Sequence, residues 1–128
     1  MIVYLDSSAV LARLFAEDRA PPESLWSEPL VSSRLLAYEC AIRLNARDVP
    51  LSVREHARAL LDRVGFTDQS AEVLARALEP FPQPVRTLDA LHLATLDYLR
   101  RQGDEVALAT YDARLIAAAT AMRIPLYR

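Results

Sequence analysis

Short apolar runs alternate with longer amphipathic segments along this chain. The runs predict strands at residues 2–5, 30–31, 65–68, 106–109 and 124–126. Apolar residues at helical spacing, preceded by serine, aspartate or proline, predict helices over residues 8–16, 33–47, 52–65, 70–78, 86–102 and 112–122, with a helical turn at 22–26. This alternation predicts an α/β fold with a mostly parallel sheet and helices on both faces.

The chain length and composition fit one globular domain. With 128 residues and 52% hydrophobic residues, we expect a single domain over residues 1–128 with a real core. No apolar run reaches the about 18 residues that cross a bilayer, and the N-terminus lacks a signal-peptide pattern, so no membrane association is expected. Cys40 is the only cysteine, which excludes an internal disulfide and favours a cytoplasmic location.

The charged residues exclude several classes of protein. All 15 basic residues are arginine, which excludes phosphate-loop NTPases, Schiff-base enzymes and receiver domains, because these need a lysine. The formal net charge of −2 argues against a nucleic-acid-binding protein at first sight. If several acids hold a metal ion, however, the remaining surface is mildly positive, so composition leaves RNA binding open.

Four acids fit poorly on a solvated surface. Most others have an arginine at helical spacing, as Glu72 has Arg76 and Asp97 has Arg101, or lie in turns. The four exceptions end or follow an apolar strand, or lie beside the apolar stripe of a helix, where an unpaired carboxylate is costly. They are Asp6, Glu39, Asp89 and Asp112.

Each of these acids also has a structural explanation when it is taken alone. Glu39 can pair with Arg43 and Asp89 with Arg86, while Asp6 and Asp112 can cap the helices that follow them. Together they favour one site, because the carboxyl ends of parallel strands meet at one edge of the sheet. Oxygen ligands suit Mg²⁺ or Mn²⁺ better than zinc, and such an ion can activate water and hold a phosphodiester.

Weaker signals surround the same edge. Ser7, Ser8 and Thr110 can cap helices or orient a water molecule, and capping is the favoured role for at least one of them. His92, one turn after Asp89, is interpreted as a core or helix-edge histidine rather than a catalytic base. Arginines near the edge are candidates for phosphate contact, namely Arg13, Arg34, Arg43, Arg86 and Arg114.

Four segments resemble the acidic motifs of PIN-domain nucleases, in order along the whole chain. They are residues 4–9 (YLDSSA), 33–39 (SRLLAYE), 86–94 (RTLDALHLA) and 109–115 (ATYDARL). The resemblance implies a parallel sheet of four or five strands and a Mg²⁺- or Mn²⁺-dependent endoribonuclease. Asp6, Glu39, Asp89 and Asp112 would be its metal-binding and catalytic acids, supported by Ser7, Ser8 and Thr110. Small proteins of this kind are mostly VapC-type toxins, which form homodimers and are inhibited by an antitoxin whose tail occupies the active-site groove.

Other functions remain possible at this point. A PIN-like RNA-processing factor is one, and a catalytically idle module that binds RNA or a partner protein is another, although the presence of all four acids argues against the idle module. A phosphatase is disfavoured because position 8, two residues after Asp6, is a serine. A receiver domain is disfavoured because the chain has no lysine.

Overall fold

A four-stranded parallel sheet forms the centre of the molecule. The computed structural model describes all residues, 1–128. The strand order is β3-β2-β1-β4, and every neighbouring pair is parallel. The strands are β1 (Ile2–Leu5), β2 (Leu30–Ser33), β3 (Val64–Thr67) and β4 (Val106–Ala109). The α/β fold and the parallel sheet are therefore confirmed, whereas the fifth strand expected at residues 124–126 is only an isolated bridge between Leu126 and Leu108.

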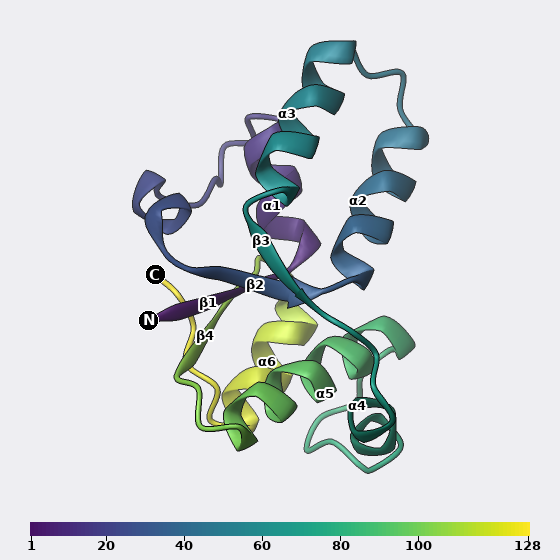
Figure 1. The fold of residues 1–128 in the computed structure, drawn as a ribbon, viewed down its shortest axis with the longest axis vertical. Helices are drawn as coiled ribbons and strands as arrows, with labels where there is room; N and C mark the ends of the chain where they lie inside the picture. Colours follow the sequence, from purple (N-terminus) through teal and green to yellow (C-terminus); the bar gives the residue numbers. More distant parts are fainter.

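Helices cover both faces of the sheet. In Figure 1, α1, α2 and α3 lie above the sheet and α4, α5 and α6 lie below it. Their bounds are α1 Ser7–Leu14, α2 Leu35–Asn45, α3 Leu51–Leu61, α4 Ala71–Ala77, α5 Thr87–Arg101 and α6 Ala113–Ala121, with a 3₁₀ helix, η1, at Glu23–Ser27. None of these helices has the length and apolar character needed to cross a membrane.

The central strand β1 divides the core in two. Val3 and Leu5 belong to a buried cluster with residues of α1, α2 and α3. Tyr4 belongs to a second buried cluster with residues of α5, β4 and α6, including Leu93 and Leu115. Successive side chains of a strand point to opposite faces, so a strand buried on both faces is apolar at every position.

The helix predicted over residues 52–65 differs from the observed helix at both ends. The observed helix begins one residue earlier, at Leu51, after Pro50. A proline lacks an N–H group, so it can precede a helix without leaving a donor unpaired. The helix ends at Leu61, four residues before the predicted end. The reason is that Val64–Thr67 form β3, in which Gly65 pairs with Val31 of β2. The sheet pairing thus shortens a helix that local periodicity extends.

One predicted ion pair is wrong. Arg76 does not pair with Glu72 within its own helix; its Nε donates to a carboxylate oxygen of Asp97 over 2.8 Å, which ties α4 to α5. The guanidinium also lies over the ring of Phe81, with its carbon 4.4 Å from the ring centroid. The predicted pair between Asp97 and Arg101 does form, at 3.2 Å. The packing of α4 against α5 therefore places Asp97, which is largely buried, within reach of Arg76, and Arg76 pairs with it instead of with Glu72.

Candidate active site

The four acids singled out in the sequence line one hollow at the carboxyl edge of the sheet. Asp6 follows β1 and Asp112 follows β4, and each is the N-cap residue of the next helix. Glu39 lies in the second turn of α2, and Asp89 lies in the first turn of α5. Side chains of all four border a cavity of about 300 Å³. The fold thus brings together carboxylates from segments that are far apart in the chain.

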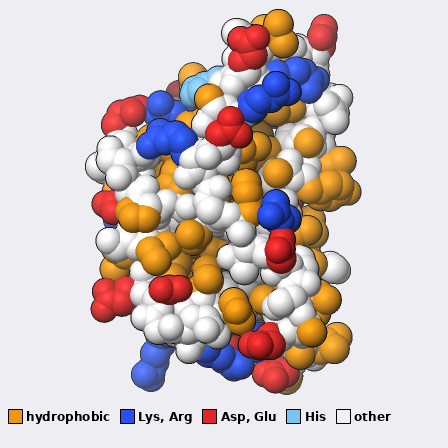
Figure 2. Space-filling model, in the orientation of Figure 1, with side chains coloured by type: hydrophobic (Ala, Val, Ile, Leu, Met, Phe, Trp, Pro, Cys, Tyr) orange, Lys and Arg blue, Asp and Glu red, His pale blue; other side chains and the backbone are white.

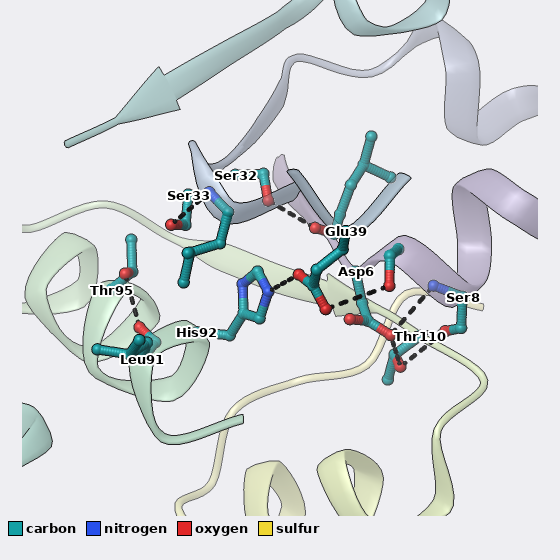
Figure 3. Close-up of polar contacts among 12 residues, drawn as sticks. Asp6, Ser8, Ser32, Ser33, Glu39, Leu91, His92, Thr95 and Thr110 are labelled. Atoms are coloured by element: carbon teal, nitrogen blue, oxygen red, sulfur yellow. Dashed lines mark hydrogen bonds and ion pairs between the residues drawn. The ribbon is translucent and has the colours of Figure 1, made fainter. Parts of the chain in front are cut away.

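Asp6 is the most buried of the four acids, with 6% of its surface exposed. Its Oδ2 atom accepts hydrogen bonds from the Ser8 N–H at 3.3 Å, the Ser8 hydroxyl at 2.6 Å and the Thr110 hydroxyl at 2.8 Å. Figure 3 shows these hydroxyls around one side of the carboxylate. The hydrogen bonds leave the other oxygen, Oδ1, free for a ligand.

Glu39 contacts His92, a residue that the sequence placed in the core. His92 is 1% exposed, as expected for a core residue, yet its Nε2 lies 2.5 Å from Oε1 of Glu39. On its other side, Nδ1 lies 2.7 Å from the hydroxyl of Tyr4 (Figure 3 shows His92 turned toward Glu39). Ligand atoms of Asp6, Glu39 and His92 all lie within 4.8 Å of one another. The spacing of His92 from Asp89 indicated its direction, but nothing in the sequence indicated Tyr4 as its partner.

Asp112 and Asp89 differ in how they are held. Oδ1 of Asp112 accepts the N–H groups of Arg114 at 2.9 Å and Leu115 at 3.2 Å, so its capping role is real, and Oδ2 makes no hydrogen bond. The pKa of Asp89 is raised, first by partial burial and then by the negative charge of Asp112, with a smaller contribution from Asp6. The acids of this hollow therefore repel one another, and Asp89 lacks a compensating cation.

The ion pairs that offered a structural explanation for two of the acids are absent. Glu39 forms no salt bridge with Arg43, and Asp89 forms none with Arg86. Free carboxylate oxygens on Asp6 and Asp112, next to an uncompensated Asp89, are the donors that a hard divalent cation prefers. The residues present thus fit a Mg²⁺ or Mn²⁺ ion.

Three of the five candidate arginines border a second hollow next to the acids. This cavity of about 570 Å³ is lined by Arg43, Arg86 and Arg114 together with Glu39, Asp89 and Asp112. None of the three arginines pairs with an acid. Arg19, which the sequence analysis missed, borders the first hollow with its guanidinium over the ring of Tyr111.

The other two candidate arginines are held by neighbours. Arg13 pairs with Glu23 at 2.6 Å and lies over the Trp26 ring, and Arg34 pairs with Asp68. On the face shown in Figure 2, acidic and basic side chains are interspersed, with exposed hydrophobic side chains between them. The arginines available to a phosphate are therefore identified by their place beside the acids and by the absence of an ion pair.

Cys40 is a packing residue of α2. It is completely buried in α2, and burial, followed by the nearby charge of Glu39, raises the pKa of its thiol to about 12. A thiol with such a pKa stays protonated at neutral pH, so Cys40 is a packing residue and no nucleophile.

Comparison with known proteins agrees with the fold and the acidic motifs. Residues 3–121 match the family described as PIN domain. The chain therefore belongs to the PIN-domain family, as a nuclease of the VapC type. A curated relative is Ribonuclease VapC47 of Mycobacterium tuberculosis (strain CDC 1551 / Oshkosh), which is 30% identical over 123 residues, covering 91% of this chain and 88% of the relative.

Proposed function

We propose that this protein is a divalent-metal-dependent endoribonuclease and the toxin of a type II toxin–antitoxin pair. The observation that carries the proposal is the hollow at the end of β1 and β4, where Asp6, Glu39, Asp89 and Asp112 converge and none of them forms a salt bridge with an arginine. Unpaired arginines border the adjoining hollow. An acidic centre next to free guanidinium groups suits a metal ion and a phosphodiester together.

The acids, hydroxyls and arginines around the two hollows would have different roles in RNA cleavage. Mg²⁺ or Mn²⁺, when bound, would polarise the scissile phosphate and activate the attacking water. Ligand atoms of Asp6 and Glu39 lie within 4.8 Å of each other, and these two side chains would hold the cation, with Asp89 and Asp112 completing its environment. Ser8 and Thr110 fix the Asp6 carboxylate through its Oδ2 atom. Arg43, Arg86 and Arg114 would bind phosphates of the RNA on either side of the bond that is cleaved.

The protein would act on RNA in the cytoplasm and bind an antitoxin and a second copy of itself. The relative's name, Ribonuclease VapC47, supports RNA as the substrate, and a cognate antitoxin would occupy the same groove. A cytoplasmic location follows from an RNA target. We also propose a homodimer, supported by large apolar side chains that remain exposed on α2 (Tyr38 and Ile42), on α4 (Leu74) and at the C-cap of α4 (Leu78). A catalytically idle module is not favoured, because all four acids are present.

Cleavage of a fluorescent RNA by the purified protein tests the proposal. We expect cleavage with Mg²⁺ or Mn²⁺, none with EDTA, and losses of orders of magnitude for Asp6→Asn and Asp89→Asn. Asp104→Asn is the control, because Asp104 lies in the exposed turn before β4. Cleavage by the Asp89→Asn protein in EDTA at the wild-type rate would refute the nuclease site. Growth arrest on expression, relieved by the product of the neighbouring gene, tests the toxin assignment separately.

A further inference from the structure

A chain of hydrogen bonds runs from the buried end of β2 to the acidic hollow. The backbone N–H of Ser33 donates to the Tyr4 hydroxyl oxygen over 3.2 Å. That hydroxyl lies 2.7 Å from Nδ1 of His92, and Nε2 of the same ring lies 2.5 Å from Oε1 of Glu39. Tyr4 and His92 are 0% and 1% exposed, so water does not compete for these contacts.

We assign the direction of each hydrogen bond from the groups that can donate. The Tyr4 hydroxyl is a phenol, which is neutral at physiological pH and can donate one hydrogen. Its oxygen accepts the Ser33 N–H over 3.2 Å, and its own hydrogen is in position to be donated to Nδ1 of His92 over 2.7 Å. A neutral imidazole that accepts at Nδ1 carries its proton at Nε2, and Nε2 faces the Glu39 carboxylate.

We propose that His92, oriented by Tyr4, is a positioning residue that fixes the Glu39 carboxylate for metal binding. His92 donates to Oε1, so Oε2 is the oxygen presented to the cation. The Ser7 hydroxyl is 3.5 Å from Oε2 and does not hold it tightly. Mutation of a hydrogen-bonded partner that orients a metal-binding side chain typically costs about 10- to 100-fold in metal affinity or activity. This inference rests on the proposed metal site.

Direct coordination by His92 is the competing arrangement, since its ring lies in the tight cluster with Asp6 and Glu39. Coordination would need a lone pair on Nε2 and hence the proton on Nδ1. Nδ1–H would then face the Tyr4 oxygen, and Glu39 would lose its donor. The two arrangements therefore differ in which ring nitrogen of His92 carries the proton.

Nitrogen-15 NMR of the metal-free protein determines which ring nitrogen of His92 carries the proton. His56 on α3 is the internal reference. We expect the Nε2–H form for His92, with an Nε2 proton resonance shifted downfield by Glu39. In a Glu39→Ala variant this proton should lose the downfield shift, while the His56 signals stay unchanged. An Nδ1–H form in the wild type, or loss of the Nε2 proton on saturation with Mg²⁺, would overturn the proposal.

Calorimetric titration with Mn²⁺ supplies the second test. His92→Leu removes the donor and should weaken Mn²⁺ binding by about 10- to 100-fold. His92→Gln keeps an N–H near the Nε2 position and should recover part of that loss, and Tyr4→Phe should give a smaller loss. His56→Gln should bind Mn²⁺ as the wild type does. Wild-type affinity in folded His92→Gln and His92→Leu proteins would refute the positioning role.

Failure of the metal site and failure of this inference give different results. If the wild type binds no divalent cation, the proposed function fails, while the Nε2 proton resonance still reports whether His92 holds Glu39. If the wild type binds Mn²⁺ and the variants bind it equally well, the metal site stands and His92 has only a packing role.

Discussion

The hydroxyl of Thr110 donates to Oδ2 of Asp6 over 2.8 Å, joining the residues that follow β4 and β1. The Ser8 hydroxyl donates to the same oxygen, and the Tyr111 N–H donates to the Ser8 oxygen in turn. The two adjacent strand ends are thereby locked around one carboxylate. Three donors on Oδ2 leave Oδ1 as the oxygen that faces the hollow.

Removing the Thr110 hydroxyl should loosen this carboxylate. Thr110→Val keeps the shape of the side chain but deletes one donor to a charged acceptor, so we expect a loss of about 1–2 kcal/mol in unfolding free energy. The rate of RNA cleavage should fall while the protein stays folded, because the Asp6 carboxylate loses a hydrogen bond that fixes its orientation. Urea unfolding and cleavage assays measure the two effects. Thr120→Val, on the exposed side of α6, is the matched control and should leave both unchanged.

The repulsion at Asp89 should appear in the pH dependence of stability. Its pKa in the folded protein is raised above the usual 3.8, so the folded state binds the proton more tightly than the unfolded chain does. Stability without metal should therefore be greatest below that value and fall as pH rises through the raised pKa. Asp89→Asn should melt higher than the wild type at neutral pH in EDTA, with the difference disappearing in acid.

Thermal melts between acid and neutral pH measure this difference, with Asp104→Asn as a control that should follow the wild type. Added Mg²⁺ or Mn²⁺ should raise the melting temperature of the wild type in a concentration-dependent way, because the ion binds only the assembled site. A pH-independent gap between Asp89→Asn and the wild type would contradict the assignment of the repulsion to this carboxyl group.

Two substitutions at Asp112 separate its cap from its charge. Asparagine caps a helix about as well as aspartate, and it removes the charge that repels Asp89. In EDTA at neutral pH, Asp112→Asn should therefore be at least as stable as the wild type but should lose most of the RNA cleavage when metal is added. Asp112→Ala removes the cap as well and should cost about 1 kcal/mol of unfolding free energy. Chemical denaturation and cleavage assays of both variants decide the question. Full cleavage by Asp112→Asn would mean that this residue is a helix cap alone.

The arginines should differ in their effect on RNA binding. Arg43→Ala, Arg86→Ala and Arg114→Ala each remove an unpaired guanidinium beside the acids and should weaken binding. Each should also reduce the salt dependence, by about 0.7 in the slope of log affinity against log salt for a single strand. Arg34→Ala should leave the slope unchanged, because Arg34 is paired with Asp68. Filter binding of Asp89→Asn protein across a salt series in EDTA, without cleavage, gives the slopes.

The sequence determined the fold class and the identity of the acids. Apolar runs broken by amphipathic segments specify parallel strands and covering helices, because periodicity is a local property of the chain. Asp6 and Asp112 were identifiable because an acid at or just past the end of a buried strand lies at the carboxyl edge of the sheet. The end of α5 is also a local property of the chain, because Gly103, two residues after it, adopts a φ of 95°, which side chains disfavour.

Only the tertiary structure decided the partners of these residues. Helical spacing in the sequence allowed Glu39 to pair with Arg43, but Glu39 contacts His92. It predicted that Arg76 pairs with Glu72, but Arg76 pairs with Asp97. The sequence also indicated five candidate arginines for phosphate contact without ranking them. In the structure, Arg13 and Arg34 form ion pairs with Glu23 and Asp68 instead. Which partner a charged side chain reaches depends on the segments that packing places beside it, and those segments are distant in sequence. For that reason the Tyr4–His92–Glu39 contacts, which span 88 and 53 residues, exist only in the folded protein.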